Sequence, residues 1–108
     1  MKYFVSSLEG ELLDTAVIRA LPDHAWLDQF PMPSSNWLDG GPLLDLFKLM
    51  IVPIHSISGA THRFSRWEAS MYLAPSPPSN GIYCFGPTPL IAAMRCIVAN
   101  LSGEEIDL

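Results

Sequence analysis

Apolar residues recur at helical spacing along the first fifth of the chain. Between Leu8 and Leu21 the leucine, alanine and valine positions follow one another three or four residues apart, which predicts an amphipathic helix with one buried face. The segment 6–9 fits a capping box, in which the Ser6 side chain accepts from the Glu9 amide. Pro22 ends this helix, because the residue before a proline is pushed out of the helical region.

The segment 22–36 contains three prolines and no sustained period. We expect an irregular connection here, held against the core by Trp26 and Phe30.

A second helix follows, and its start depends on Pro42. Proline fits the first position of a helix, where its missing N–H costs nothing, so we expect a helix over about 42–49. Residues 36–40 would then form the turn that leads into it. A single helix from Trp37, kinked at Pro42, is the alternative.

The middle of the chain is rich in β-branched and aromatic residues, which favour strands. Residues 51–57 predict a strand, and Pro53 confines it to an edge because proline cannot donate to a ladder. Residues 62–73 and 82–85 predict two further strands. The Pro/Ser-rich stretch 74–81 predicts an exposed loop, with its Asn-Gly pair in a tight turn.

The last helix has clear signals at both ends. Thr88 fits the N-cap, Pro89 the first helical position and Gly103 the stop. Its apolar stripe consists of Leu90, Ile91, Met94, Ile97, Val98 and Leu101. Residues 105–108 alternate between polar and apolar and could add an edge strand.

Together these elements predict a single α+β domain, residues 1–108, with about three helices packed on a small antiparallel sheet of two to four short strands. The chain is 49% hydrophobic and only 16% charged, which predicts a core that forms without a metal or a disulfide framework. This composition excludes intrinsic disorder.

The charge balance narrows the range of partners. Six basic and eleven acidic residues give a net charge of -5, so general nucleic-acid binding is not expected. Arg63, Arg66 and Arg95 lie in an otherwise charge-poor part of the chain, and a patch of three arginines is compatible with docking one anionic group.

We expect a cytoplasmic protein with no membrane segment. The apolar residues 3–5 are too few for a signal peptide, and the run 43–54 is interrupted by charges and a proline. In such a protein Cys84 and Cys96 are expected to be reduced, buried, small apolar side chains. A disulfide or a reactive thiol is the alternative.

Catalytic signatures are mostly absent from the sequence. It contains no phosphate-binding glycine loop and no nucleophile elbow. His24, His55 and His62 do not have the spacing of a zinc-binding helix. We therefore expect no catalytic residue, no metal site and no cofactor.

Two groups of residues are candidates for binding. The first could stack a ring and hydrogen-bond its edges beside the flexible Gly-Gly pair; it comprises Asn36, Trp37, Asp39 and Trp67, with Arg63, Arg66 or Arg95 contacting an anion. The second contains residue types enriched at the centres of interfaces: Arg63, Arg66, Trp67, Met71 and Tyr72. The alternatives are structural. The tryptophans would be core residues, Asp39 would cap a helix that starts near Pro42, and residues 62–73 would be a strand with one buried face.

Three blocks of the sequence resemble a family of short phage and prophage proteins. They read Asn-Trp-x-x-Gly-Gly-Pro-Leu-Leu at 36–44, Trp-x-Ala at 67–69 and Gly-Pro-Thr-Pro-Leu-Ile-Ala-Ala-Met-Arg at 86–95. Residues 8–17 are similar to that family's opening helix. The family carries no assigned activity, so the resemblance implies only a phage-derived protein that acts in a bacterial cytoplasm.

Two hypotheses of function follow. The first is a phage accessory protein that binds a host or phage protein, or a second copy of itself as a homodimer, without catalysis. The second is a small-ligand binding protein or enzyme with a pocket near Trp37, Asp39, Trp67 and Arg95.

Overall fold

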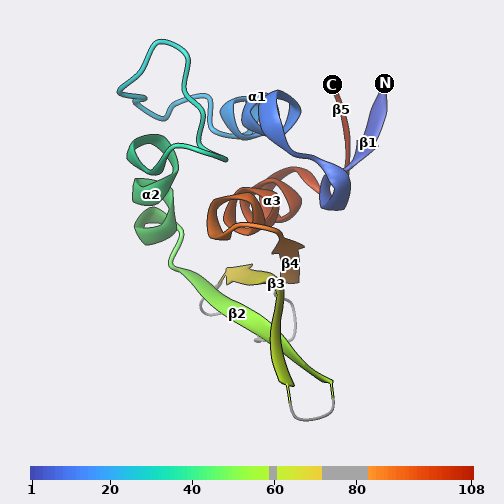
Figure 1. Ribbon diagram of the computed structural model, residues 1–108. Coiled ribbons are helices and arrows are strands. Elements are labelled where there is room, and N and C mark those ends of the chain that lie inside the picture. Colours follow the sequence, from blue (N-terminus) through green and yellow to red (C-terminus); the bar gives the residue numbers. More distant parts are fainter. Residues whose placement is uncertain (59–60, 72–82) are drawn as a thin grey trace.

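The computed structural model describes residues 1–58, 61–71 and 83–108 and shows an α+β fold, as predicted (Figure 1). Its elements in chain order are β1 (Lys2–Phe4), the 3-10 turn η1 (Val5–Ser7), α1 (Gly10–Ala20), α2 (Trp37–Leu46), β2 (Leu49–Ser58), β3 (Thr61–Met71), β4 (Tyr83–Gly86), α3 (Pro89–Ser102) and β5 (Glu105–Asp107). The predicted loop 74–81 lies outside the described residues. In the described part of the chain, no helix is long and apolar enough to cross a membrane.

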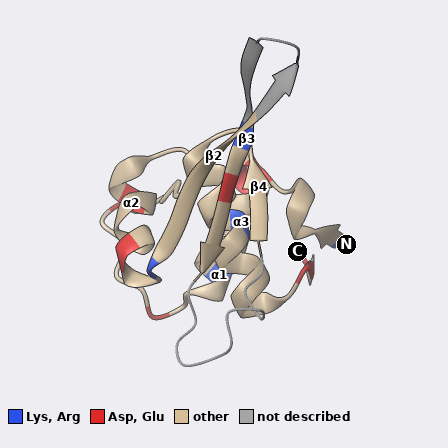
Figure 2. Cartoon of the chain, turned by 90° about the horizontal axis from the view of Figure 1, so that it is seen from below, with Lys and Arg blue, Asp and Glu red and all other residues tan. Residues whose placement is uncertain are grey.

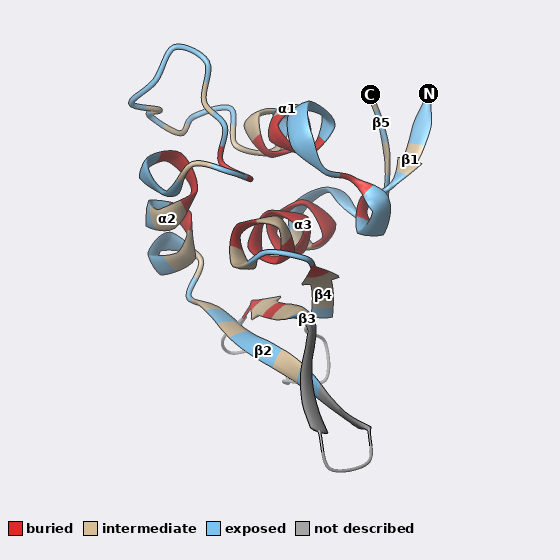
Figure 3. Ribbon diagram, viewed as in Figure 1, coloured by how far each residue is buried: buried red, intermediate tan, exposed pale blue. Residues whose placement is uncertain are grey.

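Helix α3 forms the centre of the fold. It lies between α1 and the sheet of β2, β3 and β4, with α2 at one flank (Figure 1). All residues from position 92 to position 99 are buried, and Figure 3 shows α3 as the most continuously buried element. Small residues allow close packing on the sheet: a side-chain carbon added at Gly86 of β4 would lie 2.7 Å from the backbone nitrogen of Ala92.

Both ends of α3 are confirmed. The Thr88 hydroxyl accepts from the amide of Ile91 at 3.1 Å, Pro89 is the first helical residue, and Gly103 ends the helix with a φ of 100°. The apolar stripe was predicted one turn too long. Leu101 is exposed, because the last turn of α3 extends beyond the elements that cover its middle.

The three larger strands form an antiparallel sheet in the order β2-β3-β4, with Pro53 on the edge strand as predicted. The pairing of β2 with β3 runs from Leu49 opposite Met71 to Ser58 opposite Thr61. Among the described residues, strand β4 pairs with positions 67–70 of β3. The β2–β3 ribbon therefore extends beyond the third strand, which Figure 1 shows as an arm directed away from the helices.

The capping box at 6–9 is wrong. Residues 5–7 instead form η1, in which the Ser7 hydroxyl donates to the Phe4 carbonyl at 2.9 Å, and Glu9 precedes α1 without a side-chain cap. This turn places Val5 and Leu8 in the core, where both are almost completely buried. Gly10, with a φ of 60°, then redirects the chain into α1.

The expected helix over 42–49 is also wrong, and the alternative of one helix from Trp37 is confirmed. Pro42 lies inside α2. The Asn36 side chain accepts from the amide of Leu38 at 3.0 Å, and the Asn36 carbonyl accepts from the amides of Asp39 and Gly40. These bonds close the first helical turn before Pro42, so the missing N–H of the proline does not prevent an earlier start.

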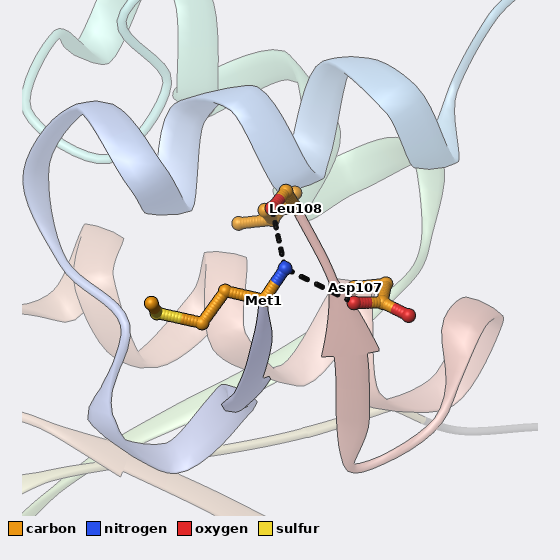
Figure 4. A network of polar contacts seen from close by, with 3 residues as sticks. All are labelled: Met1, Asp107 and Leu108. Atoms are coloured by element: carbon orange, nitrogen blue, oxygen red, sulfur yellow. Dashed lines mark hydrogen bonds and ion pairs between the residues drawn. The ribbon is translucent and has the colours of Figure 1, made fainter.

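The two chain ends form a second antiparallel sheet, which we call the terminal clasp: β1 paired with β5. Lys2 lies opposite Asp107 and Phe4 opposite Glu105. The Met1 ammonium lies 3.3 Å from the Asp107 carboxylate and donates to the Leu108 carbonyl at 3.2 Å (Figure 4). The strand at 105–108 is thus confirmed, but its partner β1 was not predicted.

Candidate functional site

Helix α2 exposes large apolar side chains along its outer side. Leu38 is 70% exposed, and Trp37 and Leu46 are more than half exposed, whereas Leu43 on the opposite side is fully buried. Figure 3 shows the corresponding outer turns of α2 as exposed. The helix therefore buries one narrow face and presents apolar residues to solvent on the other.

The segment that precedes α2 adds to this exposed apolar area. Trp26 packs against the core as expected, with His24 edge-on at a ring distance of 4.5 Å. Phe30 was expected to do the same, but it is 79% exposed. We call the combined area the α2 surface; it comprises Leu27, Phe30, Met32, Trp37, Leu38 and Leu46.

Two buried carboxylates hold this segment in place. Asp39 of α2, only 3% exposed, accepts from the amide of Met32 at 2.9 Å. Asp14 of α1 accepts from the amide of Ser34 at 2.8 Å. Asp39 thus does not cap a helix starting at Pro42. Because backbone bonds anchor the segment, Phe30 is not needed in the core.

A third carboxylate lies beside this anchor. The Oδ1 atom of Asp39 is buried and has no hydrogen-bond partner among the described residues. The Asp39 carboxylate can accept a hydrogen bond from the protonated form of Asp28 and repels its ionised form, and it thereby raises the pKa of Asp28 above its ordinary value. When Asp28 is protonated its hydroxyl donates to Asp39, and when it is ionised the two carboxylates repel each other.

The second predicted group, on β3, faces two ways. Met71 is buried in the core, and the partly buried Trp67 packs against the core. Both lie on β3, which is the central strand of the sheet beneath α3. Arg66 is exposed, and its guanidinium lies 3.9 Å from the ring centroid of Phe85 on β4. The side chain of Arg63 and all of Tyr72 lie outside the described residues.

The structure does not bring the first predicted group into one pocket. Trp37 lines a cavity of about 250 Å³ beside the start of α3. Arg95 lines a different cleft, of about 620 Å³, together with Arg66. Asp39 and Trp67 line neither of these two cavities. Asn36 serves as the N-cap of α2.

Metal-binding residues do not gather in the described ranges. No three histidine, cysteine, aspartate or glutamate side chains within residues 1–58, 61–71 and 83–108 lie close enough to hold an ion. Asp28 and Asp39 interact with each other, but they are two carboxylates and not a group of three.

The sequence interpretation did not select Leu38 or Leu46, although a signal was present. Positions 37–49 are apolar on almost every side of a helix. A helix of ten residues at the flank of a small domain cannot bury all its sides, so some of these side chains must face solvent.

Comparison with known proteins adds one positive finding. A family model described as "Bacteriophage P22, NinX" matches residues 23–101. The matched region contains α2, its preceding segment, the three-stranded sheet and nearly all of α3. No curated protein matches the chain.

Proposed function

The chain belongs to the bacteriophage P22 NinX family, and we propose that it is an accessory protein that binds another protein through the α2 surface, without catalysis. The observation that carries this proposal is the exposure of six large apolar side chains on α2 and the segment before it. All six lie within the region that the family model matches. Exposed apolar patches commonly mark sites of protein association, and we propose that these six side chains form one.

The α2 surface has the structural properties of a pre-formed contact site. Asp39 and Asp14 fix the backbone that displays Met32 and its neighbours, so little ordering is needed on binding. Trp37 and Phe30 supply the large aromatic groups that dominate the binding energy at protein interfaces.

Charge around the α2 surface favours a partner other than a second copy. In the segment 22–48, which carries the α2 surface, Asp23, Asp28 and Asp45 are exposed, and the one lysine or arginine is Lys48, which lies 3.4 Å from Asp45. Two copies related by a two-fold axis would bring these acids together. We therefore propose a host or phage protein whose apolar contact face is bordered by basic residues.

We propose that this interaction takes place in the cytoplasm of the bacterial host. A phage family and two free cysteines, Cys84 and Cys96, support that location, because thiols are kept reduced there.

The proposal is tested with the double variant Leu38→Ser/Leu46→Ser. A partner is isolated from phage-infected cells, identified and purified, and its affinity is measured by titration. The double variant should bind at least about tenfold more weakly, because the centre of the contact is lost. Affinity should fall as salt rises, since the partner's basic border is screened. The matched control is Leu12→Ser/Leu101→Ser, which removes two half-exposed leucines of α1 and α3 and should bind as wild type.

Two results would contradict the proposal. Equal binding by both double variants would show that contact is made elsewhere. A dimer of the pure protein in sedimentation velocity, abolished only by Leu38→Ser/Leu46→Ser, would show that a second copy occupies the α2 surface.

A further inference from the structure

A cleft of about 620 Å³ lies away from the α2 surface, between η1, β4 and α3. Its lining includes two arginines, Arg66 and Arg95, and three aromatic residues, Phe4, Tyr83 and Phe85. We propose that this cleft binds a small organic acid, with its carboxylate at the two guanidinium groups and its apolar body against the aromatic rings.

The first argument is a buried cation without an acidic partner. Arg95 is only 8% exposed, and it donates through Nε to the Leu8 carbonyl at 2.8 Å and through Nη1 to the Phe85 carbonyl at 2.7 Å. Both acceptors are neutral. Among the described residues no carboxylate forms an ion pair with Arg95.

Burial lowers the pKa of Arg95, and the negative charges of Glu9 and Cys84 oppose that effect. An arginine nevertheless stays protonated in a protein. A buried positive charge is costly unless a counter-charge accompanies it. Since Arg95 lines the cleft, an anion that enters the cleft can supply that counter-charge.

The second argument is the placement of Arg66. Its guanidinium stacks over the ring of Phe85, whose backbone carbonyl holds Arg95. One residue of β4 thus orients both cations. Figure 2 shows basic segments of β3 and α3 close to β4. This contact holds the guanidinium of Arg66 over the ring face of Phe85, and a guanidinium can bind a carboxylate through two parallel hydrogen bonds.

The remaining lining indicates the class of anion. Phe4 and Tyr83 present exposed aromatic side chains, which suit an apolar body. Glu104 also lines the cleft, and its negative charge disfavours a dianion such as phosphate. The volume is in the usual range for a small-molecule site, roughly 300–1,000 Å³.

Cys84 provides a reporter inside the same cleft. It is half-buried there, whereas Cys96 behind it is fully buried, as expected for a core thiol. A hydrogen bond from Cys96 and the charge of Arg95 lower the pKa of Cys84, against opposing effects of burial and Glu104. Cys84 should therefore react with iodoacetamide well before Cys96.

The experiment measures the rate of Cys84 alkylation by mass spectrometry with benzoate, phenylacetate or hexanoate present. The neutral compound benzamide and inorganic phosphate are the comparison probes. We expect at least one carboxylate to slow alkylation by tenfold at saturation, and benzamide to need at least about tenfold higher concentration. Arg66→Gln should weaken protection at least tenfold, and Arg19→Gln, at an exposed arginine of α1, should not.

Three outcomes would overturn the proposal. These are no protection by any of the carboxylates at about 10 mM, equal protection by benzamide, and stronger protection by phosphate. Unchanged protection of Arg66→Gln would also contradict the assigned geometry. The Leu38→Ser/Leu46→Ser variant should keep full protection, so failure of this inference is distinguishable from failure of the protein-binding proposal.

Discussion

Three buried charged side chains hold backbone atoms that lie outside their own helices. Asp14 binds the amide of Ser34, Asp39 binds the amide of Met32, and Arg95 binds the carbonyls of Leu8 and Phe85. Each one satisfies a backbone group that would otherwise be buried in an irregular segment or at the end of an element. In this small domain, buried charged side chains anchor the backbone.

Asp39 and Arg95 were candidate binding residues in the sequence, but the backbone groups that they bind could not be predicted. A backbone amide or carbonyl is present at almost every position, so sequence pattern carries no information about which one a buried charge will bind. Exposure is equally difficult to predict from residue type. Phe30 and Trp26 are both aromatic residues of one proline-rich segment, yet only Trp26 packs against the core.

Replacing Asp28 by asparagine should stabilise the protein at pH 7. The raised pKa of Asp28 means that the folded protein binds this proton more tightly than the unfolded chain. The resulting stabilisation is complete below the ordinary aspartate pKa of about 4 and is lost as the pH rises through the raised value. Asp28→Asn removes the repulsion and keeps a donor near Asp39. Its Tm should exceed that of wild type at pH 7.

Measuring the Tm of Asp28→Asn and of wild type over a range of pH distinguishes this mechanism from a general effect of net charge. The difference between Asp28→Asn and wild type should vanish below about pH 4, where Asp28 is protonated in both states. Asp23→Asn, at another exposed carboxylate of the same segment, is the control and should leave the Tm nearly unchanged. A lower Tm for Asp28→Asn at pH 7 would contradict the mechanism.

At the scale of elements, both ends of α3 were predictable and the start of α2 was not. The signals that define α3, a capping threonine, a first-position proline and a terminal glycine, all act within the helix itself. The start of α2 depends on the turn closed by Asn36, and its position depends on contact with the preceding segment. Local preference favoured a start at Pro42, and the tertiary contacts of the first turn outweighed it.

Because α2 packs closely on the preceding segment, alanine substitutions at the adjacent residues Gly40 and Gly41 should affect stability differently. A methyl group at Gly40 would overlap the carbonyl oxygen of Pro33, a backbone atom. Gly40→Ala should therefore destabilise the fold by about 1–3 kcal/mol, as forced overpacking does. At Gly41 the nearest atom, on Trp37, is at an ordinary 3.5 Å.

Gly41→Ala is thus the matched control. It should be neutral or stabilising by up to about 1 kcal/mol, since alanine favours the helix. Urea denaturation of both variants with unchanged m-values is the measurement. Equal effects of the two substitutions would show that α2 can shift away from Pro33 at little cost.

At the scale of the whole molecule, one residue connects three parts of the fold. Arg95 joins the central helix α3 to the segment after η1 through Leu8 and to the sheet through Phe85. The order of elements along the chain was sufficient to predict a single α+β domain with an antiparallel sheet. The terminal clasp was not predictable, because β1 has only three residues and pairs with a strand about a hundred positions away.

Arg95→Met should destabilise the whole domain. It leaves the carbonyls of Leu8 and Phe85 without their donor, which costs about 1–3 kcal/mol for each buried group. Removing a buried charge offsets part of this loss, so we expect a net destabilisation of about 2 kcal/mol in urea denaturation. Amide exchange should become faster in η1 and β4. Arg19→Met, at an exposed arginine, should be nearly neutral; a fully stable Arg95→Met would show that desolvation cancels the bonds.

The terminal clasp determines how the molecule responds to tension. In β1 and β5 the two chain ends emerge at the same side, next to the pair Lys2 and Asp107. A force that pulls the ends apart therefore loads the residue pairs of the clasp one after another, starting with the Met1 contacts. Such peeling requires far less force than shearing all pairs together. Under load the clasp should open first and leave α3 and its surrounding core folded.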